Sequence, residues 1–146
     1  MTMASGLYLV SFRDVMISSP IAVNVPNASN KVILVTDAHT PAFDTHNDYA
    51  DITNEVAAGG GYTQNSKTVG GTPSWGVGAA TQLKYSWSAP VVWTTSTITA
   101  RGMIITTSVA TGLLIVGVTF GSDFASAGGD FTITAHANGI FYIDLS

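Results

Sequence analysis

The fold class is decided by the stretch Trp93-Thr-Thr-Ser-Thr-Ile-Thr-Ala-Arg101, followed by Met103-Ile-Ile-Thr-Thr107 and Leu113-Leu-Ile-Val-Gly-Val-Thr-Phe-Gly121. Threonine and isoleucine dominate these segments, and such β-branched residues fit a pleated, half-buried surface better than a helix. The segments are short, end in glycine or polar residues, and lack the periodicity of a long helix. The pattern predicts an all-β fold, a β-sandwich or jelly-roll-like domain.

The segment that follows alternates strictly between apolar and polar residues. Phe131, Ile133 and Ala135 are predicted to share one face of a strand, with threonines and His136 on the other. Asn138-Gly139 is the preferred pair for a tight type I′ turn. We therefore expect residues 131–136 to pair antiparallel with residues 140–145.

The residues from Gly102 to Gly121 carry no charge over a length close to that of a membrane span. Thr106, Thr107, Ser108, Thr111 and Gly112 interrupt this run and divide it into two strand-length pieces around a turn. The N-terminus has no basic region before an apolar core, so no secretory signal is evident. We expect a protein made and assembled in the cytoplasm, with no membrane partner.

Composition points to a subunit of an assembly. The chain has 146 residues, which suits one domain, and 46% are hydrophobic but only 10% charged. A surface with so few charges is typical of a protein that buries part of it against partners. The net charge of -4 and the scattered Lys and Arg residues argue against nucleic-acid binding.

Residues 1–30 are predicted to form an extended N-terminal interaction arm, and residues 31–146 a single β-sandwich domain. Pro20 and Pro26 prevent a continuous helix or central strand, while the segment is too apolar for a solvated tail. The side chains expected at its partner interface are Leu7, Leu9, Phe12, Val15, Met16 and Ile17.

Two blocks carry a resemblance to a known family. The first runs from Trp93 through Ser-Thr-Ile-Thr-Ala-Arg101, an apolar strand, Phe120-Gly-x-Asp123, Phe131-Thr-Ile133 and Gly139-Ile140; the second joins Lys31-Val-Ile-Leu-Val-Thr36 to an acidic loop ending in Gly59-Gly-Gly-Tyr62. In this order they resemble small virion structural proteins of tailed bacteriophages and prophages. Residues 1–30 and 63–90 match no part of the pattern.

The resemblance implies a non-enzymatic virion protein that decorates and cements the capsid by bridging shell subunits. It implies the major capsid protein as partner and a homo-oligomer that we expect to be a trimer. It also implies a protein made in the bacterial host cytoplasm that takes its place on the capsid surface of the virion. An alternative is a tail- or adhesin-associated β-sandwich module that binds host-surface carbohydrate through Trp75, Trp87 and loop carboxylates.

The acidic loop offers weak metal-ligand candidates. Asp44, His46, Asp48 and Glu55 occupy positions one, three, five and twelve of a calcium-loop template. Tyr49 stands where that template needs glycine, and a strand precedes the loop instead of a helix. We expect a solvated loop without metal or other cofactor.

No catalytic motif is present. The chain has no nucleophile elbow, paired carboxylates on a recognisable scaffold or phosphate-binding loop, which predicts that it is not an enzyme. Arg101 is an isolated charge in an almost uncharged region and should be paired. It either fastens a loop through Asp123 or Asp130, or reaches a neighbouring subunit; we favour an internal ion pair with Asp123.

Overall fold

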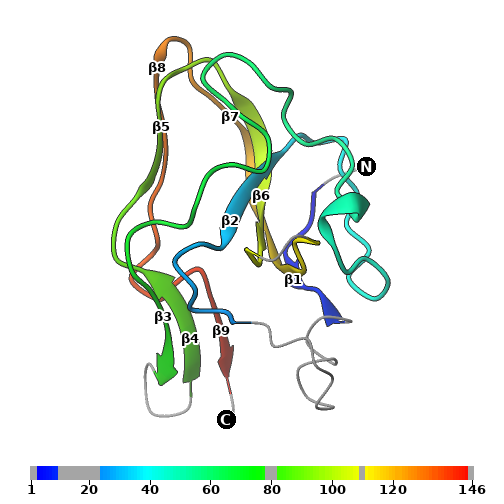
Figure 1. Ribbon diagram of the computed structural model, residues 1–146, viewed down its shortest axis with the longest axis vertical. Coiled ribbons are helices and arrows are strands. Elements are labelled where there is room, and N and C mark those ends of the chain that lie inside the picture. The colour runs from blue at the N-terminus through cyan, green and yellow to red at the C-terminus, as the bar shows by residue number, and fades with distance from the viewer. Residues whose placement is uncertain (1–2, 10–23, 78–81, 109–110, 145–146) are drawn as a thin grey trace.

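The computed structural model describes residues 3–9, 24–77, 82–108 and 111–144. These residues form nine β-strands and one short 3₁₀ helix: β1 (Gly6–Leu7), β2 (Lys31–Val35), η1 (Tyr49–Asp51), β3 (Pro73–Val77), β4 (Gln82–Trp87), β5 (Val91–Ser96), β6 (Thr99–Thr106), β7 (Leu114–Ala125), β8 (Gly129–Ile133) and β9 (Phe141–Asp144). No helix in these ranges is long and apolar enough to cross a membrane. The predicted all-β, sandwich-like fold is confirmed (Figure 1).

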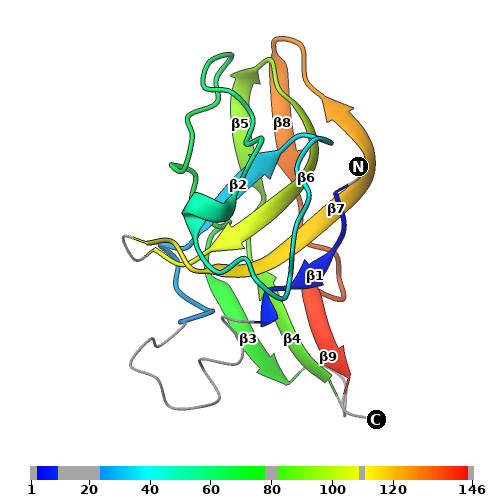
Figure 2. The same ribbon diagram turned by 90° about the vertical axis from the view of Figure 1, so that its right-hand side faces the viewer.

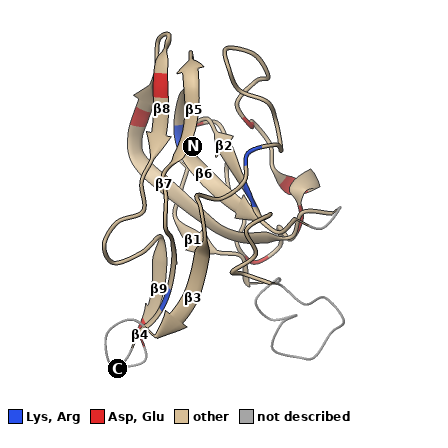
Figure 3. Ribbon diagram, turned by 60° about the vertical axis from the view of Figure 1, so that its left-hand side comes forward, with Lys and Arg blue, Asp and Glu red and all other residues tan. Residues whose placement is uncertain are grey.

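The strands form three antiparallel sheets. The largest has the order β1-β7-β6-β2, a second has the order β3-β4-β9, and β5 pairs with β8. Figure 2 places β3, β4 and β9 at one end of the long axis and β5 and β8 toward the other, with the four-stranded sheet crossing between them. The charged residues are scattered over this framework, with acidic positions on β7 and β8 (Figure 3).

The four-stranded sheet is buried on both faces. Along β2, Val32 and Leu34 belong to a core shared with β4, β5 and β8, while Ile33 and Val35 belong to a second cluster on the opposite face. Side chains alternate between the two faces of a strand, so a sheet covered on both sides needs a continuous apolar run. This explains why the segments 32–35 and 103–105 are apolar without alternation.

One two-stranded ribbon connects the sheets. Its register runs from Val91 opposite Ile133, through Thr99 opposite Ala125, to Thr106 opposite Leu114, so β5 continues into β6 and β7 into β8. The ribbon bends after β5, where buried Ser96 shares a hydrogen bond of 2.8 Å with the Ser126 hydroxyl. The predicted division of the uncharged run into two strands is therefore confirmed.

The predicted pairing of residues 131–136 with 140–145 is wrong. Asn138-Gly139 does form a turn, in which the Gly139 N–H donates to the His136 carbonyl at 2.8 Å. Beyond that turn the two strands diverge, because β8 pairs with β5 whereas β9 pairs with β4. The alternation itself is confirmed: Phe131 is buried and Ile133 half-buried, while Thr132 and Thr134 are exposed.

Residues 3–9, at the start of the expected arm, are part of the β-domain. Residues 6–7 form β1, whose Gly6 and Leu7 lie opposite Gly117 and Val116 of β7. Met3 and Tyr8 are buried in the second core cluster. The boundary at residue 30 is therefore corrected for residues 3–9, because the edge of β7 offers backbone partners that complete this sheet.

The expected partner-interface residues divide into three groups. Leu7 is half-buried and packs against the core of its own chain, whereas Leu9 is exposed over 58% of its surface. Phe12, Val15, Met16 and Ile17 lie outside the described residues, and their contact with a partner stays a prediction.

Candidate functional site

A groove runs along the strand that continues from β7 into β8. Its volume is about 880 Å³, and its lining residues are Phe120, Phe124, Ala125, Asp130, Phe131, Thr132, Ile133, Thr134 and His136. Ligand sites commonly combine apolar and aromatic lining with a few polar groups, in volumes of about 300–1,000 Å³. The groove is therefore the candidate functional site of this domain.

A large β-bulge builds the aromatic wall of the groove. Ala100 lies opposite Phe124 and Gly102 opposite Thr119, so Arg101 alone spans residues 120–123. Gly121 allows the turn within the bulge by adopting a positive φ of 80°. A bulge bends its strand and redirects side chains, which here brings Phe120 and Phe124 together with ring centroids 6.0 Å apart.

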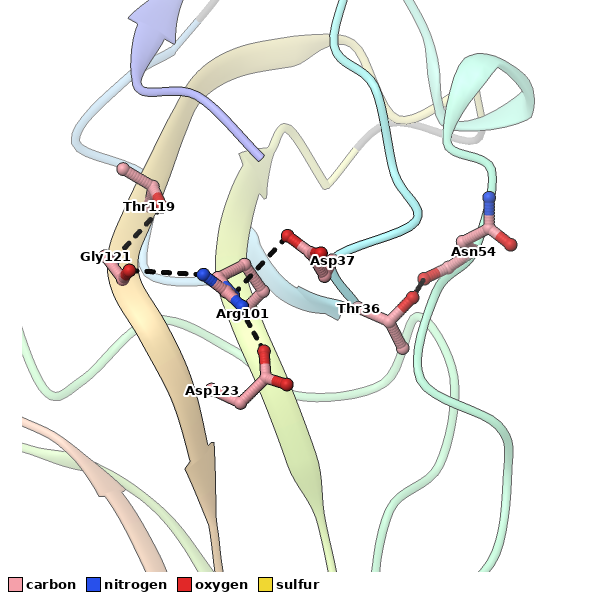
Figure 4. Close-up of polar contacts among 7 residues, drawn as sticks. All are labelled: Thr36, Asp37, Asn54, Arg101, Thr119, Gly121 and Asp123. Atoms are coloured by element: carbon pink, nitrogen blue, oxygen red, sulfur yellow. Dashed lines mark hydrogen bonds and ion pairs between the residues drawn. The ribbon is translucent and has the colours of Figure 1, made fainter. Parts of the chain in front are cut away.

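The Arg101 side chain holds the bulge together (Figure 4). Its Nε donates to Asp123 Oδ1 at 2.7 Å and its Nη1 donates to the Gly121 carbonyl at 3.1 Å. The Asp37 Oδ1, which has no hydrogen-bond partner of its own, lies 3.5 Å from the same Nε. The hydrogen bond to Asp123 raises the pKa of Arg101 above its already high ordinary value.

The predicted ion pair between Arg101 and Asp123 is thus present, but it does not fasten a loop. Asp123 lies within β7, on the strand next to that of Arg101. The pair closes the gap that the bulge opens between two neighbouring strands. Arg101 therefore positions the aromatic wall of the groove.

The groove is also lined by polar residues at every second position, which we call the polar row or polar wall. Asp130, Thr132, Thr134 and His136 are all exposed. Asp130 and Thr132 lie on β8, where alternate residues share a face about 7 Å apart. Thr134 and His136 follow the end of that strand and also line the groove. The groove therefore has one aromatic and one polar wall.

Two hydrogen bonds determine how Asp130 and His136 of this polar row are held and which atoms they can use to bind a ligand. The Thr95 N–H donates to Asp130 Oδ1 at 3.2 Å, which ties the carboxylate to the bend of the ribbon. The Asn138 N–H donates to His136 Nδ1 at 3.1 Å. Since Nδ1 accepts this bond, the neutral imidazole carries its proton on Nε2 and offers a donor.

The four metal-ligand candidates do not converge. Asp44 is exposed, His46 faces His39 with ring centroids 6.3 Å apart, and Asp48 caps η1 by accepting from the Ala50 N–H at 2.9 Å. Within the described ranges, no three side chains of His, Cys, Asp or Glu lie close enough together to hold a metal ion.

Glu55 instead holds the loop closed through tyrosines. Its carboxylate accepts from the Tyr49 and Tyr62 hydroxyls, the latter at 2.8 Å, and from the Asn65 N–H at 3.0 Å. Burial, followed by the hydrogen bond to Glu55, raises the pKa of Tyr49 to about 12. The Tyr62 hydroxyl also accepts from the Leu34 N–H at 3.0 Å, which links the loop to β2. We call Glu55, Tyr49 and Tyr62 the tyrosine clasp.

The tryptophans do not form a stacking surface. Trp87 and Trp93 are buried in the core, and Trp75 is half-buried against Tyr85 and Phe141. A saccharide cannot stack on Trp87, so of the two tryptophans named for the alternative function only the partly exposed Trp75 could contact one. The exposed aromatic residue near the polar row is Phe124. It directly follows the Phe120-Gly-Ser-Asp123 motif, but the sequence analysis gave it no role.

Comparison of the chain with protein-family models, with curated proteins and with solved structures found no match.

Proposed function

We propose that this protein is a non-enzymatic structural subunit of a tailed-bacteriophage virion that decorates and cements the capsid by bridging shell subunits. The observation that carries the proposal is the exposure of large apolar side chains on a chain with few charges. Among the described residues, Leu9, Phe124, Tyr142 and Val77 are exposed over 58%, 53%, 49% and 77% of their surfaces. Apolar side chains in such positions favour contacts with other proteins.

The placement of these side chains supports bridging. Val77 and Tyr142 belong to the sheet β3-β4-β9 at one end of the long axis, whereas Phe124 belongs to β7, which curves toward the other end (Figure 2). Leu9 lies just after β1, the strand that pairs with β7. A subunit with apolar side chains on separated surfaces can contact more than one neighbour at once, which a cement requires.

The partners follow from the same proposal. The major capsid protein forms the lattice, and the protein itself forms a homo-oligomer, which we expect to be a trimer because closed symmetry buries such surfaces without leaving open interfaces. A net charge of -4 with scattered basic residues supports the expectation that nucleic acid is not a partner.

Copy number tests the proposal. Particles purified from cells that carry the gene should contain the protein in amounts comparable to the major shell protein, as measured by quantitative mass spectrometry. Electron microscopy should then place it on the outer surface of the shell. A handful of copies per particle, or density confined to the tail, would overturn the capsid role.

A further inference from the structure

We propose that the groove between the aromatic and polar walls binds a neutral saccharide chain. The proposal goes beyond a role in capsid assembly, since it concerns the isolated domain and needs no shell protein. It rests on the lining of the groove, its charge and the bulge that shapes it.

The aromatic wall offers an apolar surface of the right kind. Phe124 leaves 53% of its surface exposed and meets Phe120 edge to face at an interplanar angle of 89°. A pyranose ring carries its C–H groups on its faces, and these pack against aromatic rings by dispersion and by burial of apolar surface. One wall can therefore hold the apolar face of a sugar ring.

The polar wall supplies partners for hydroxyl groups. Thr132 and Thr134 each bring a hydroxyl that donates and accepts, the Asp130 carboxylate accepts, and His136 donates through Nε2. Asp130 and Thr132 are about 7 Å apart on one face of β8, and Thr134 and His136 extend the polar row beyond its end, so successive side chains can reach different hydroxyls of a chain. This combination of donors and acceptors suits a polyhydroxyl ligand.

Charge selects against anionic ligands. No lysine or arginine is among the groove's lining residues, which include Asp130. The guanidinium of Arg101 is engaged by Asp123, Asp37 and the Gly121 carbonyl. A phosphorylated or otherwise acidic polymer would meet a carboxylate without a free cation, so the groove favours a neutral saccharide.

An extended peptide is the competing occupant, because β5 is the only pairing partner of β8 among the described residues. A peptide that extended the sheet would bond to backbone groups along this edge. The groove is lined mainly by side chains rich in hydroxyl, carboxylate and aromatic groups, which favours the saccharide.

The test is a titration of ¹⁵N-labelled protein with millimolar maltohexaose, cellohexaose, chitohexaose and mannohexaose, followed by NMR. At least one of these should shift the amide resonances of Phe124, Thr132 and Thr134. The Phe124→Ala variant should bind it about tenfold more weakly, and so should Thr134→Val, which keeps the side-chain shape but removes the hydroxyl. Tyr142→Ala removes an equally exposed aromatic ring from β9 and should bind as the unmodified protein does.

Several results would overturn the proposal. They are no shift with any of the four saccharides, shifts that map away from residues 120–136, and unchanged affinity in Phe124→Ala. A heparin fragment that binds more tightly than every neutral hexasaccharide would refute the neutral class. If a mixture of random decapeptides shifts the groove resonances while no saccharide does, the groove belongs to a peptide. Because these measurements use the isolated protein, their failure would leave the capsid role standing.

Discussion

Replacing Glu55 should reveal how much the tyrosine clasp contributes to stability. In Glu55→Ala the hydroxyls of Tyr49 and Tyr62 and the Asn65 N–H lose their shared acceptor. The Tyr62 side chain is buried, so water cannot readily replace Glu55 as the acceptor for its hydroxyl group. Glu55→Gln keeps one carbonyl oxygen as acceptor and is the conservative counterpart.

The expected loss can be worked out from these contacts. A hydrogen bond to a charged group contributes about 1.5–3 kcal/mol, and a buried donor without an acceptor costs about 1–3 kcal/mol. Glu55 and Tyr49 are only half-buried, so hydrogen bonds to water recover part of the lost free energy in the variant. We expect Glu55→Ala to lower the free energy of unfolding by about 3 kcal/mol and Glu55→Gln by about 1 kcal/mol.

Urea unfolding followed by circular dichroism measures the difference. With a slope of about 2 kcal/mol per molar urea, a loss of about 3 kcal/mol moves the midpoint down by about 1.5 M. Asp44→Ala, at an exposed position of the same loop, should stay within about 0.5 kcal/mol of the unmodified protein. If Glu55→Ala were no less stable than Asp44→Ala, the clasp would not hold the loop.

Three further predictions follow from the same structure. Tyr8→Ala should lower the free energy of unfolding by about 3–5 kcal/mol, measured by chemical denaturation, because Tyr8 is fully buried. Leu9→Ala should leave that free energy nearly unchanged because Leu9 is exposed. Equal effects of the two substitutions would mean that residues 3–9 are not part of the core. Burial lowers the pKa of His39 below its ordinary value of 6.5. The unfolded chain therefore binds more protons than the folded chain below that pH, and the melting temperature should fall from pH 7.5 to pH 5. The fall should be smaller in His39→Gln, and an identical fall in that variant would show that other groups cause it. Millimolar EDTA should leave the melting temperature unchanged, and a shift of several degrees would show that a metal stabilises the loop.

Local patterns in the sequence predicted local structure correctly. The alternation from Asp130 to His136 depends only on strand geometry, and the structure places Phe131 inside and the threonines outside. The isolated charge of Arg101 indicated a carboxylate partner, because an unpaired charge is costly. Asn138-Gly139 also forms its turn, but a turn fixes only its own residues, and the sheets to which the flanking strands belong depend on distant segments.

The groove and the clasp depend on contacts that spacing along the chain does not encode. The aromatic wall exists because Arg101 faces four residues of β7, a register that becomes visible only when both strands are placed. Glu55 matched a calcium-loop spacing, yet its partners are Tyr49 and Tyr62, six and seven residues away along the chain. The Tyr62 hydroxyl also accepts from the Leu34 N–H, 28 residues earlier in β2. Phe124 carried no signal of its own, since an exposed phenylalanine differs from a buried one only in its surroundings.

The pairing of β1 with β7 has a consequence for biosynthesis. Gly6 leaves the ribosome first but pairs with Gly117, more than a hundred residues later in the chain. At a synthesis rate of about 5–20 residues per second, the N-terminal strand waits for several seconds before its partner is made. During that interval Met3 and Tyr8, which are buried in the folded protein, are exposed to solvent. Nascent chains stalled before residue 114 should therefore recruit chaperones or aggregate, and the four-stranded sheet should close only after β7 has emerged.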